Sequence, residues 1–198
     1  MSGTLPWYVA RAAGLVAWAL LGAATLWGLA LSTKSPRRAF GQRPRPNWLL
    51  DMHRWLGGTA LAFTGVHVLA LMADQYTHFG LDAILVPLAS SWHPVAVAWG
   101  VVAFYLLLAV ELTSLARSHI SKRAWRRVHA ASFVLFVSAT VHGLSAGTDT
   151  TSAPARIIVL GVSTVFVGLT AVRVGELARS RAAVHAPVAR RREVLVNR

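Results

Sequence analysis

Cysteine is absent from this chain of 198 residues. Its absence excludes disulfide bonds, iron–sulfur clusters, thiolate ligation of haem and covalent haem attachment of the c type. Acidic residues are also scarce, with 7 Asp and Glu against 20 Lys and Arg. Charged residues make up 14% of the chain, below the roughly 25% that is typical of soluble domains. Any haem would have to be held non-covalently, by histidine.

Long apolar runs are abundant by contrast. The chain is 55% hydrophobic, contains eight Trp and has a mean hydropathy of +0.52. Five runs are long enough to cross the roughly 30 Å hydrocarbon layer of a membrane as helices. They are Trp7–Leu31, Trp48–Met72, Pro94–Ala116, Trp125–Leu144 and Ala155–Leu177. The sequence therefore predicts an all-α integral membrane protein, a five-helix transmembrane bundle without an evident internal repeat.

The basic residues, which give a net charge of +13, lie almost entirely between or after the apolar runs. The connections after the first and third runs and the tail after the fifth are rich in Lys and Arg, whereas residues 73–93 and 145–154 contain none. By the positive-inside rule, this pattern predicts an N-terminus outside and a cytoplasmic C-terminus. The distribution indicates contact with anionic membrane lipid and argues against nucleic acid as a partner.

The same pattern divides the chain into three predicted segments. Residues 1–46 comprise the first transmembrane helix and a basic cytoplasmic loop, residues 47–178 form a four-helix transmembrane core, and residues 179–198 form a basic cytoplasmic tail that we expect to be disordered. The outer segment Leu81–Leu88 is apolar but too short to span. It is either a short interfacial or re-entrant helix or a loop resting on lipid.

Four histidines stand out, because imidazole is rare inside lipid unless it pairs, relays protons or binds a ligand. His53 and His67 lie on the second helix, and His129 and His142 on the fourth. A separation of 14 residues corresponds to a rise of roughly 21 Å and a change in direction of only about 40°. Since the second and fourth helices run the same way in the predicted topology, we expect His53 to face His129 and His67 to face His142.

The spacing on the fourth helix does not fit an ideal helix. A separation of 13 residues leaves His129 and His142 about 140° apart. Either this helix is locally overwound, or the two histidines meet their ligands on different sides of it.

Two imidazoles facing each other can supply both axial ligands of a haem iron, which leaves no open coordination position and suits electron transfer. We therefore predict two b-type haems between helices two and four, with a single haem as the alternative. Arg54 and Arg126 could hold the propionates of the inner haem, or only anchor their helices at the interface. Arg156 is a weaker candidate for the outer propionates.

Small and hydroxylated residues near the histidines have two interpretations each. Gly57, Gly58 and Gly65 permit close approach either of a flat ring or of a neighbouring helix. Several hydroxyl groups could orient the imidazoles, although bonding to their own helix backbone is the commoner use. These are Thr64, Ser132, Ser138 and Thr140.

The pattern His53-x13-His67 with His129-x12-His142 resembles the ferric reductase-like transmembrane domain family. The segments WLLDMHRWLGG, VPLASSWHPVAVAWG and WRRVHAASF are similar to those of actinobacterial members. The family includes the membrane parts of NADPH oxidases and ferric-chelate reductases and the haem subunit of a bacterial periplasmic methionine sulfoxide reductase system. Over roughly residues 47–177, the resemblance implies a bacterial cell membrane location, an inner haem held by His53 and His129, and an outer haem held by His67 and His142.

The chain departs from the larger family members. Oxidases and ferric reductases carry a cytoplasmic flavin and nicotinamide domain after the last helix, whereas about twenty residues follow it here, too few for such a fold. Many members also have a sixth helix, and no Gly-rich dinucleotide motif is present. We therefore expect an oxidoreductase component that receives electrons from a separate flavoprotein or quinone and passes them to an unidentified acceptor outside.

Three other interpretations remain. The chain could be a single-haem, quinone-linked subunit of a periplasmic reductase system, a non-haem proton-relay or transport protein, or an assembly subunit whose histidines only pack. The proton-relay hypothesis is weakened because Asp51 and Glu111 both lie near the cytoplasmic end rather than at mid-membrane. Visible absorption separates these hypotheses, since only a haem protein is coloured and redox-active.

Overall fold

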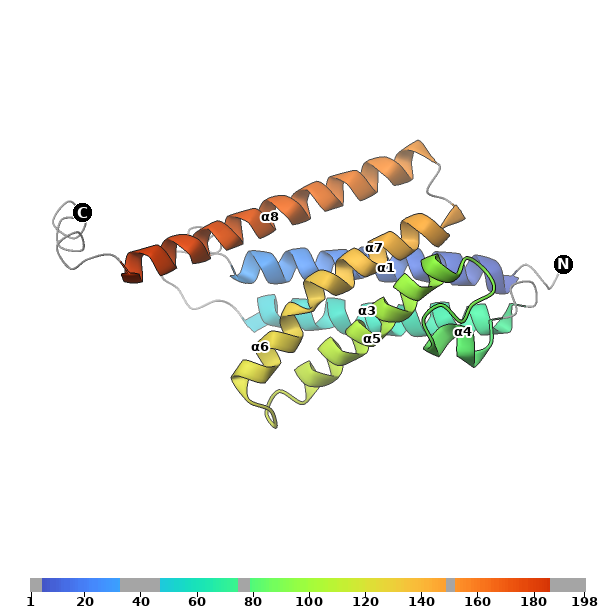
Figure 1. The fold of residues 1–198 in the computed structure, drawn as a ribbon, viewed down its shortest axis with the longest axis horizontal. Coiled ribbons are helices and arrows are strands. Elements are labelled where there is room, and N and C mark those ends of the chain that lie inside the picture. Colours follow the sequence, from blue (N-terminus) through green and yellow to red (C-terminus); the bar gives the residue numbers. More distant parts are fainter. Residues whose placement is uncertain (1–4, 33–46, 75–78, 149–151, 186–198) are drawn as a thin grey trace.

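The computed structural model describes residues 5–32, 47–74, 79–148 and 152–185, which are largely helical (Figure 1). Five helical runs in this part of the chain are long and apolar enough to cross a membrane. The all-α, five-span architecture is thus confirmed, and the chain is a multi-pass membrane protein. The helices are α1 (Leu5–Ser32), α3 (Asn47–Ala73), α4 (Leu81–Leu85), α5 (Pro94–Leu115), α6 (Lys122–Ala130), α7 (Ser132–Ala146) and α8 (Ala153–His185).

The predicted ends of the spans lie within a few residues of the observed ones, except at the C-terminal side. There α8 continues beyond the predicted end at Leu177 to His185. The predicted basic loop of residues 33–46 and the last part of the tail, residues 186–198, lie outside the described residues.

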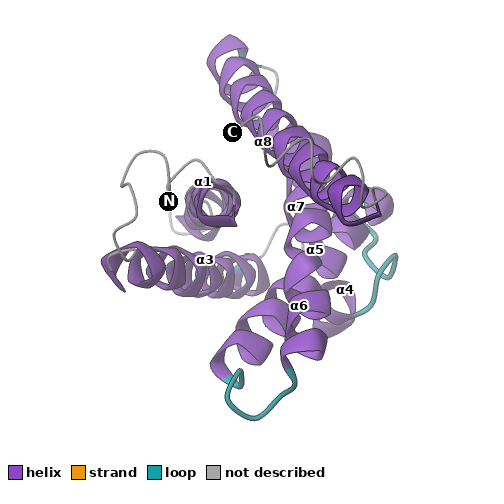
Figure 2. Ribbon diagram, turned by 90° about the vertical axis from the view of Figure 1, so that its left-hand side faces the viewer, coloured by secondary structure: helices purple, strands orange, loops and turns teal. Residues whose placement is uncertain are grey.

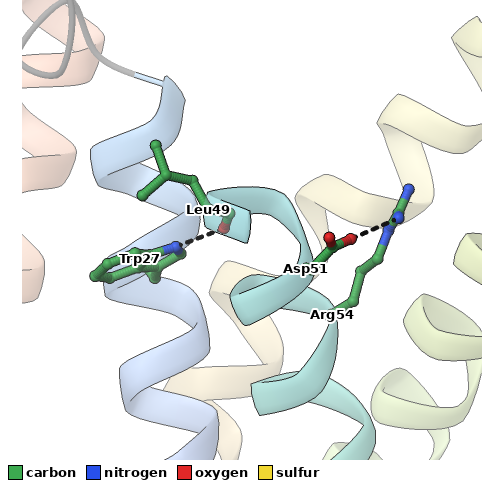
Figure 3. Close-up of polar contacts among 4 residues, drawn as sticks. All are labelled: Trp27, Leu49, Asp51 and Arg54. Atoms are coloured by element: carbon green, nitrogen blue, oxygen red, sulfur yellow. Dashed lines mark hydrogen bonds and ion pairs between the residues drawn. The ribbon is translucent and has the colours of Figure 1, made fainter. Parts of the chain in front are cut away.

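The helices pack as two antiparallel pairs with a fifth helix alongside. α1 lies against α3, α5 lies against the α6–α7 run, and α8 packs on α1 (Figures 1 and 2). The end of α1 is tied to the start of α3, because the indole Nε1 of Trp27 donates a 2.8 Å hydrogen bond to the carbonyl of Leu49 (Figure 3). Many large apolar side chains point away from the bundle, including Leu69 and Leu115 at 67% and 80% exposure, as expected of surfaces that face lipid.

A central apolar layer joins the helices halfway along the bundle. Ala60 of α3 is fully buried and lies midway in sequence between His53 and His67, while Leu135 of α7 lies midway between His129 and His142. Ala60 and Leu135 thus lie between the two histidine levels. The buried apolar cluster to which they belong comprises Leu21, Leu29, Ala60, Ala103, Leu107, Leu135, Phe136 and Phe166.

The fourth span is interrupted at Ala131, between α6 and α7. The amide of Ala131 donates to the carbonyl of Val128 at 2.9 Å, an i to i−3 bond. Such bonds wind the chain at about 3.0 residues per turn instead of 3.6. The fourth span is thus overwound locally at this break, and one such turn supplies about 60° of the roughly 140° between His129 and His142.

The segment 81–88, which the sequence predicted to lie outside, begins with the short helix α4. Ala83 and Ile84 of this helix are buried and cluster with Val97 and Val101 of α5. The hydroxyl of Tyr105 donates to the carbonyl of Leu85 at 2.7 Å. The segment is thus a short helix packed on the bundle at one end, rather than a loop resting on lipid.

Candidate functional site

The structure brings the four histidines together as two pairs, one at each level of the bundle. The ring centroids of His53 and His129 are 5.9 Å apart, and those of His67 and His142 are 6.3 Å apart. Both pairs join α3 to the fourth span, so α3 and the α6–α7 run point the same way along the bundle. This is the arrangement predicted from the sequence. The role of the four residues as ligands remains a prediction.

The ring separations can be compared with those required by a six-coordinate iron. An imidazole nitrogen lies about 1.1 Å from its ring centroid, and histidine binds first-row metals at about 2.0–2.1 Å. Two imidazoles on opposite sides of one iron would therefore have centroids about 6.2–6.4 Å apart. The angles of 73° and 76° between the ring planes are compatible with this, because both planes contain the axis at any mutual rotation. The pairs fit axial ligation of haem.

In three of the four histidines, the hydrogen bond of the ring is made by Nδ1, which leaves Nε2 available as a metal ligand. The Nδ1 atoms of His53, His67 and His142 lie 3.1, 2.7 and 2.8 Å from the carbonyls of Ala24, Ala10 and Ala96 respectively. A carbonyl can only accept, so each Nδ1 carries the proton and each Nε2 keeps its lone pair. Metal-binding histidines characteristically donate their second nitrogen to such an acceptor, which fixes the tautomer and the ring orientation.

His129 has a different environment. Its Nδ1 lies 3.5 Å from the hydroxyl of Ser114 on α5. Its ring also stacks on Trp125, with centroids 4.8 Å apart and planes at 23°, and the guanidinium of Arg117 lies 4.8 Å from the Trp125 centroid. The buried Nε1 of Trp125 has no hydrogen-bond partner among the described residues. An orphaned donor beside this pair would suit a propionate of a bound haem.

Two of the arginines predicted to hold propionates, Arg54 and Arg126, have exposed side chains. Arg54 is exposed and pairs with Asp51 at 3.2 Å, one turn earlier on α3 (Figure 3). Arg126 is exposed on α6. The side chain of Arg156 lies outside the described part of the chain. Both the propionate role and the anchoring role of Arg54 and Arg126 therefore remain predictions.

The structure shows what surrounds most of the glycines and hydroxyl groups singled out in the sequence. Gly57 packs against the carboxyl group of Glu111, whereas nothing lies within 4 Å of a Cβ built at Gly58 or Gly65. Thr64 and Thr140 donate to carbonyls of their own helices at 2.8 Å, the commoner of the two uses considered. Helix packing accounts for Gly57 but for neither of the other two glycines. A further candidate, Ser138, is fully buried without a hydrogen-bond partner in the described part of the chain.

Sequence reasoning missed the residues that orient the imidazoles. A Cβ at Gly14 would lie 2.9 Å from Nδ1 of His67, one at Gly28 would lie 3.0 Å from Cε1 of His53, and one at Gly100 would lie 2.8 Å from Nδ1 of His142. These three contacts are closer than side-chain carbons ordinarily allow. The signal in the sequence was the spacing of Gly14 and Gly28, which equals the 14-residue spacing of His53 and His67.

Comparisons with known proteins agree with this picture. Residues 13–140, from α1 into α7, match the family model described as ferric reductase like transmembrane component. The matched stretch includes His53, His67 and His129 and ends two residues before His142. No solved structure matches the chain.

One curated relative is the protein-methionine-sulfoxide reductase heme-binding subunit MsrQ of Azospira oryzae, which is 34% identical over 104 residues. The match covers 50% of this chain and 41% of the relative. The similarity therefore extends over less than half of the relative's length.

Proposed function

Because this chain belongs to the ferric reductase-like transmembrane component family, we propose that it carries electrons across a membrane through two haems, each held between two histidines. His53 and His129 hold one haem, and His67 and His142 hold the other. Without cysteine the haems are non-covalent and of the b type. Each bound haem supplies a one-electron couple with no open coordination position. The protein's own residues orient the ligands and separate the two levels.

The observation that carries this proposal is that both histidine pairs have a ring separation close to that expected of two ligands on one haem iron. Both ring separations, 5.9 and 6.3 Å, are close to the roughly 6.2–6.4 Å expected across one iron. The described residues contain no group of three or more His, Cys, Asp or Glu side chains that could hold a bare metal ion. Two ligands per site is the number required when a macrocycle supplies the other four.

We place the His53–His129 level on the cytoplasmic side of a bacterial cell membrane, with the N-terminus outside and the C-terminus inside. Electrons then enter from a separate flavoprotein or from quinone and leave to an acceptor outside. A relative named as the heme-binding subunit of a reductase supports the idea that the chain works with a partner protein.

The haem content of detergent-purified protein tests the proposal. A reduced-minus-oxidised spectrum of the b type and about two haems per chain are expected. His119→Ala is the matched control, because His119 is an exposed histidine outside both pairs and its loss should leave the haem content unchanged. One haem per chain would favour the single-haem alternative. No haem, in cells supplied with excess haem, would refute electron transfer and leave the proton-relay and packing hypotheses.

The orientation can be tested separately, because the absence of cysteine makes single-cysteine variants unambiguous. Ala89 lies in the connection between α4 and α5, Ser118 lies in the connection between α5 and α6, and both are exposed. These two connections are at opposite ends of α5 (Figure 1). We expect a membrane-impermeant maleimide to label Ala89→Cys in intact cells, or spheroplasts where an outer membrane is present, and to label Ser118→Cys only after the membrane is permeabilised. The reverse pattern would invert the proposed topology while leaving the haem pairs as they are.

A further inference from the structure

Backbone carbonyls that face the histidines recur at a fixed interval on α1 and α5. We call each a carbonyl seat: the carbonyl of one residue together with the small residue four positions later. Two seats on α1 are 14 residues apart, and two positions on α5 are also 14 residues apart. The seats are Ala10/Gly14 for His67, Ala24/Gly28 for His53, Ala96/Gly100 for His142 and Val110/Ser114 for His129.

The small residue is what makes each seat accessible. Within a helix, the carbonyl of residue i already accepts the amide of residue i+4, so an imidazole reaches its second lone pair over the surface of residue i+4. A Cβ at Gly100 would lie 2.8 Å from both Nδ1 and Cε1 of His142. The ring therefore occupies the space where any other side chain would begin.

The fourth seat differs from the other three. Ser114 occupies the position of the glycine, and its hydroxyl donates to the carbonyl of Val110 at 2.7 Å. Because a hydroxyl has one proton and that proton is used, its oxygen can only accept from Nδ1 of His129, 3.5 Å away. His129 thus has only a 3.5 Å contact to a hydroxyl oxygen, where the other three histidines have a shorter hydrogen bond to a carbonyl.

We propose that Ser114 sets the reduction potential of the haem held by His53 and His129 above that of the haem held by His67 and His142. The inference rests on the proposed function. A hydrogen bond from Nδ1 to an acceptor makes the imidazole a stronger ligand, which stabilises the more highly charged ferric iron and lowers the potential. The His67–His142 level has two such bonds, of 2.7 and 2.8 Å. The other level has one of 3.1 Å and the long contact to Ser114.

Two substitutions of Ser114 have opposite expected effects. Ser114→Gly opens the carbonyl of Val110 to His129, as in the other three seats, and should lower the potential of that haem. We expect its ferrous-to-ferric ratio at a fixed ambient potential to fall by roughly tenfold, equivalent to about 59 mV for a one-electron couple. Ser114→Ala removes the acceptor and keeps a Cβ over the carbonyl, so the same potential should rise. The other haem should keep its potential in both variants.

Potentiometric titration of the purified holoprotein, followed by visible spectra, measures these shifts, and the ferric electron paramagnetic resonance signal of the same haem should change alone. The affected haem is identified as the one lost in His129→Ala. Unchanged potentials with two haems bound, equal shifts at both haems, or shifts of the same sign in the two variants would overturn the inference. If Ser114→Gly binds less haem, the inference is tested by Ser114→Ala alone. A fall in the potential of the His53–His129 haem in that variant refutes the inference. An unmodified protein without haem would instead refute the proposed function.

Discussion

His67→Ala and His142→Ala are each expected to remove one, and the same, of the two proposed haems. Their rings face each other at 6.3 Å, so either substitution leaves an iron with a single axial ligand from the protein. The haem-to-protein ratio should fall from about two to about one. Electron transfer across the membrane of proteoliposomes should fall to background, because the level near one surface is then empty.

The pairing itself is tested by the double variant. Since His67 and His142 serve one site, His67→Ala with His142→Ala should lose no more haem than either single variant, a non-additivity expected of residues that act as a unit. His67→Ala with His129→Ala removes one ligand from each level, so it should lose both haems. Equal losses in these two double variants, or the survival of one haem in the second, would show that the histidines are not paired as the structure arranges them.

The remaining haem should persist in each single variant because the two levels are structurally separate. Ala60 and Leu135 are buried between the two levels, and the apolar cluster to which they belong contains no histidine. The spectrum of His67→Ala should therefore equal that of His142→Ala and differ from that of His53→Ala. This comparison assigns each spectral component to its level.

The spans and the histidine pairs could be predicted from the sequence, because both follow from simple periodicities. Twenty apolar residues fix a membrane helix, and a 14-residue spacing fixes two imidazoles on one face of it. The phase mismatch between His129 and His142 also predicted either a local departure of the fourth helix from ideal geometry or ligands on different sides of it. It did not locate the break, because Ala131 and its neighbour Ala130 are both strong helix formers.

The partners of the imidazoles could not be predicted in the same way. Three of the four acceptors lie on backbone carbonyls, which every residue carries, so they have no side-chain signature. The hydroxyl groups of Thr64 and Thr140 bond to their own helices, the commoner of the two uses considered, and so do not orient the imidazoles through a carbonyl. Only the glycines mark the seats, and two glycines spaced 14 residues apart on one helix are too sparse to register as an internal repeat.

Substitution of those glycines is expected to remove one of the two haems. Gly14→Ala and Gly100→Ala each place a methyl group within 2.9 Å of Nδ1 of His67 or His142, and the ring must move off its carbonyl. In an unconstrained helix interior, Gly→Ala gains up to about 1 kcal/mol of stability. Here the same change should weaken haem binding at the His67–His142 level. The double variant Gly14→Ala with Gly100→Ala should therefore bind about one haem per chain instead of two.

Gly161→Ala with Gly168→Ala is the matched control, because nothing lies within 4 Å of a Cβ at either position on α8. That variant should keep both haems and melt at the same or a higher temperature. Titration of each purified protein with haem separates an effect on haem binding from an effect on stability. The double variant Gly14→Ala with Gly100→Ala should bind haem at the His53–His129 level with unchanged affinity. Its haem affinity at the His67–His142 level should fall by at least roughly tenfold. Full haem content and an unaltered spectrum in this double variant would show that the imidazoles do not need their carbonyls, and that the close approach of Gly14 and Gly100 serves helix packing alone.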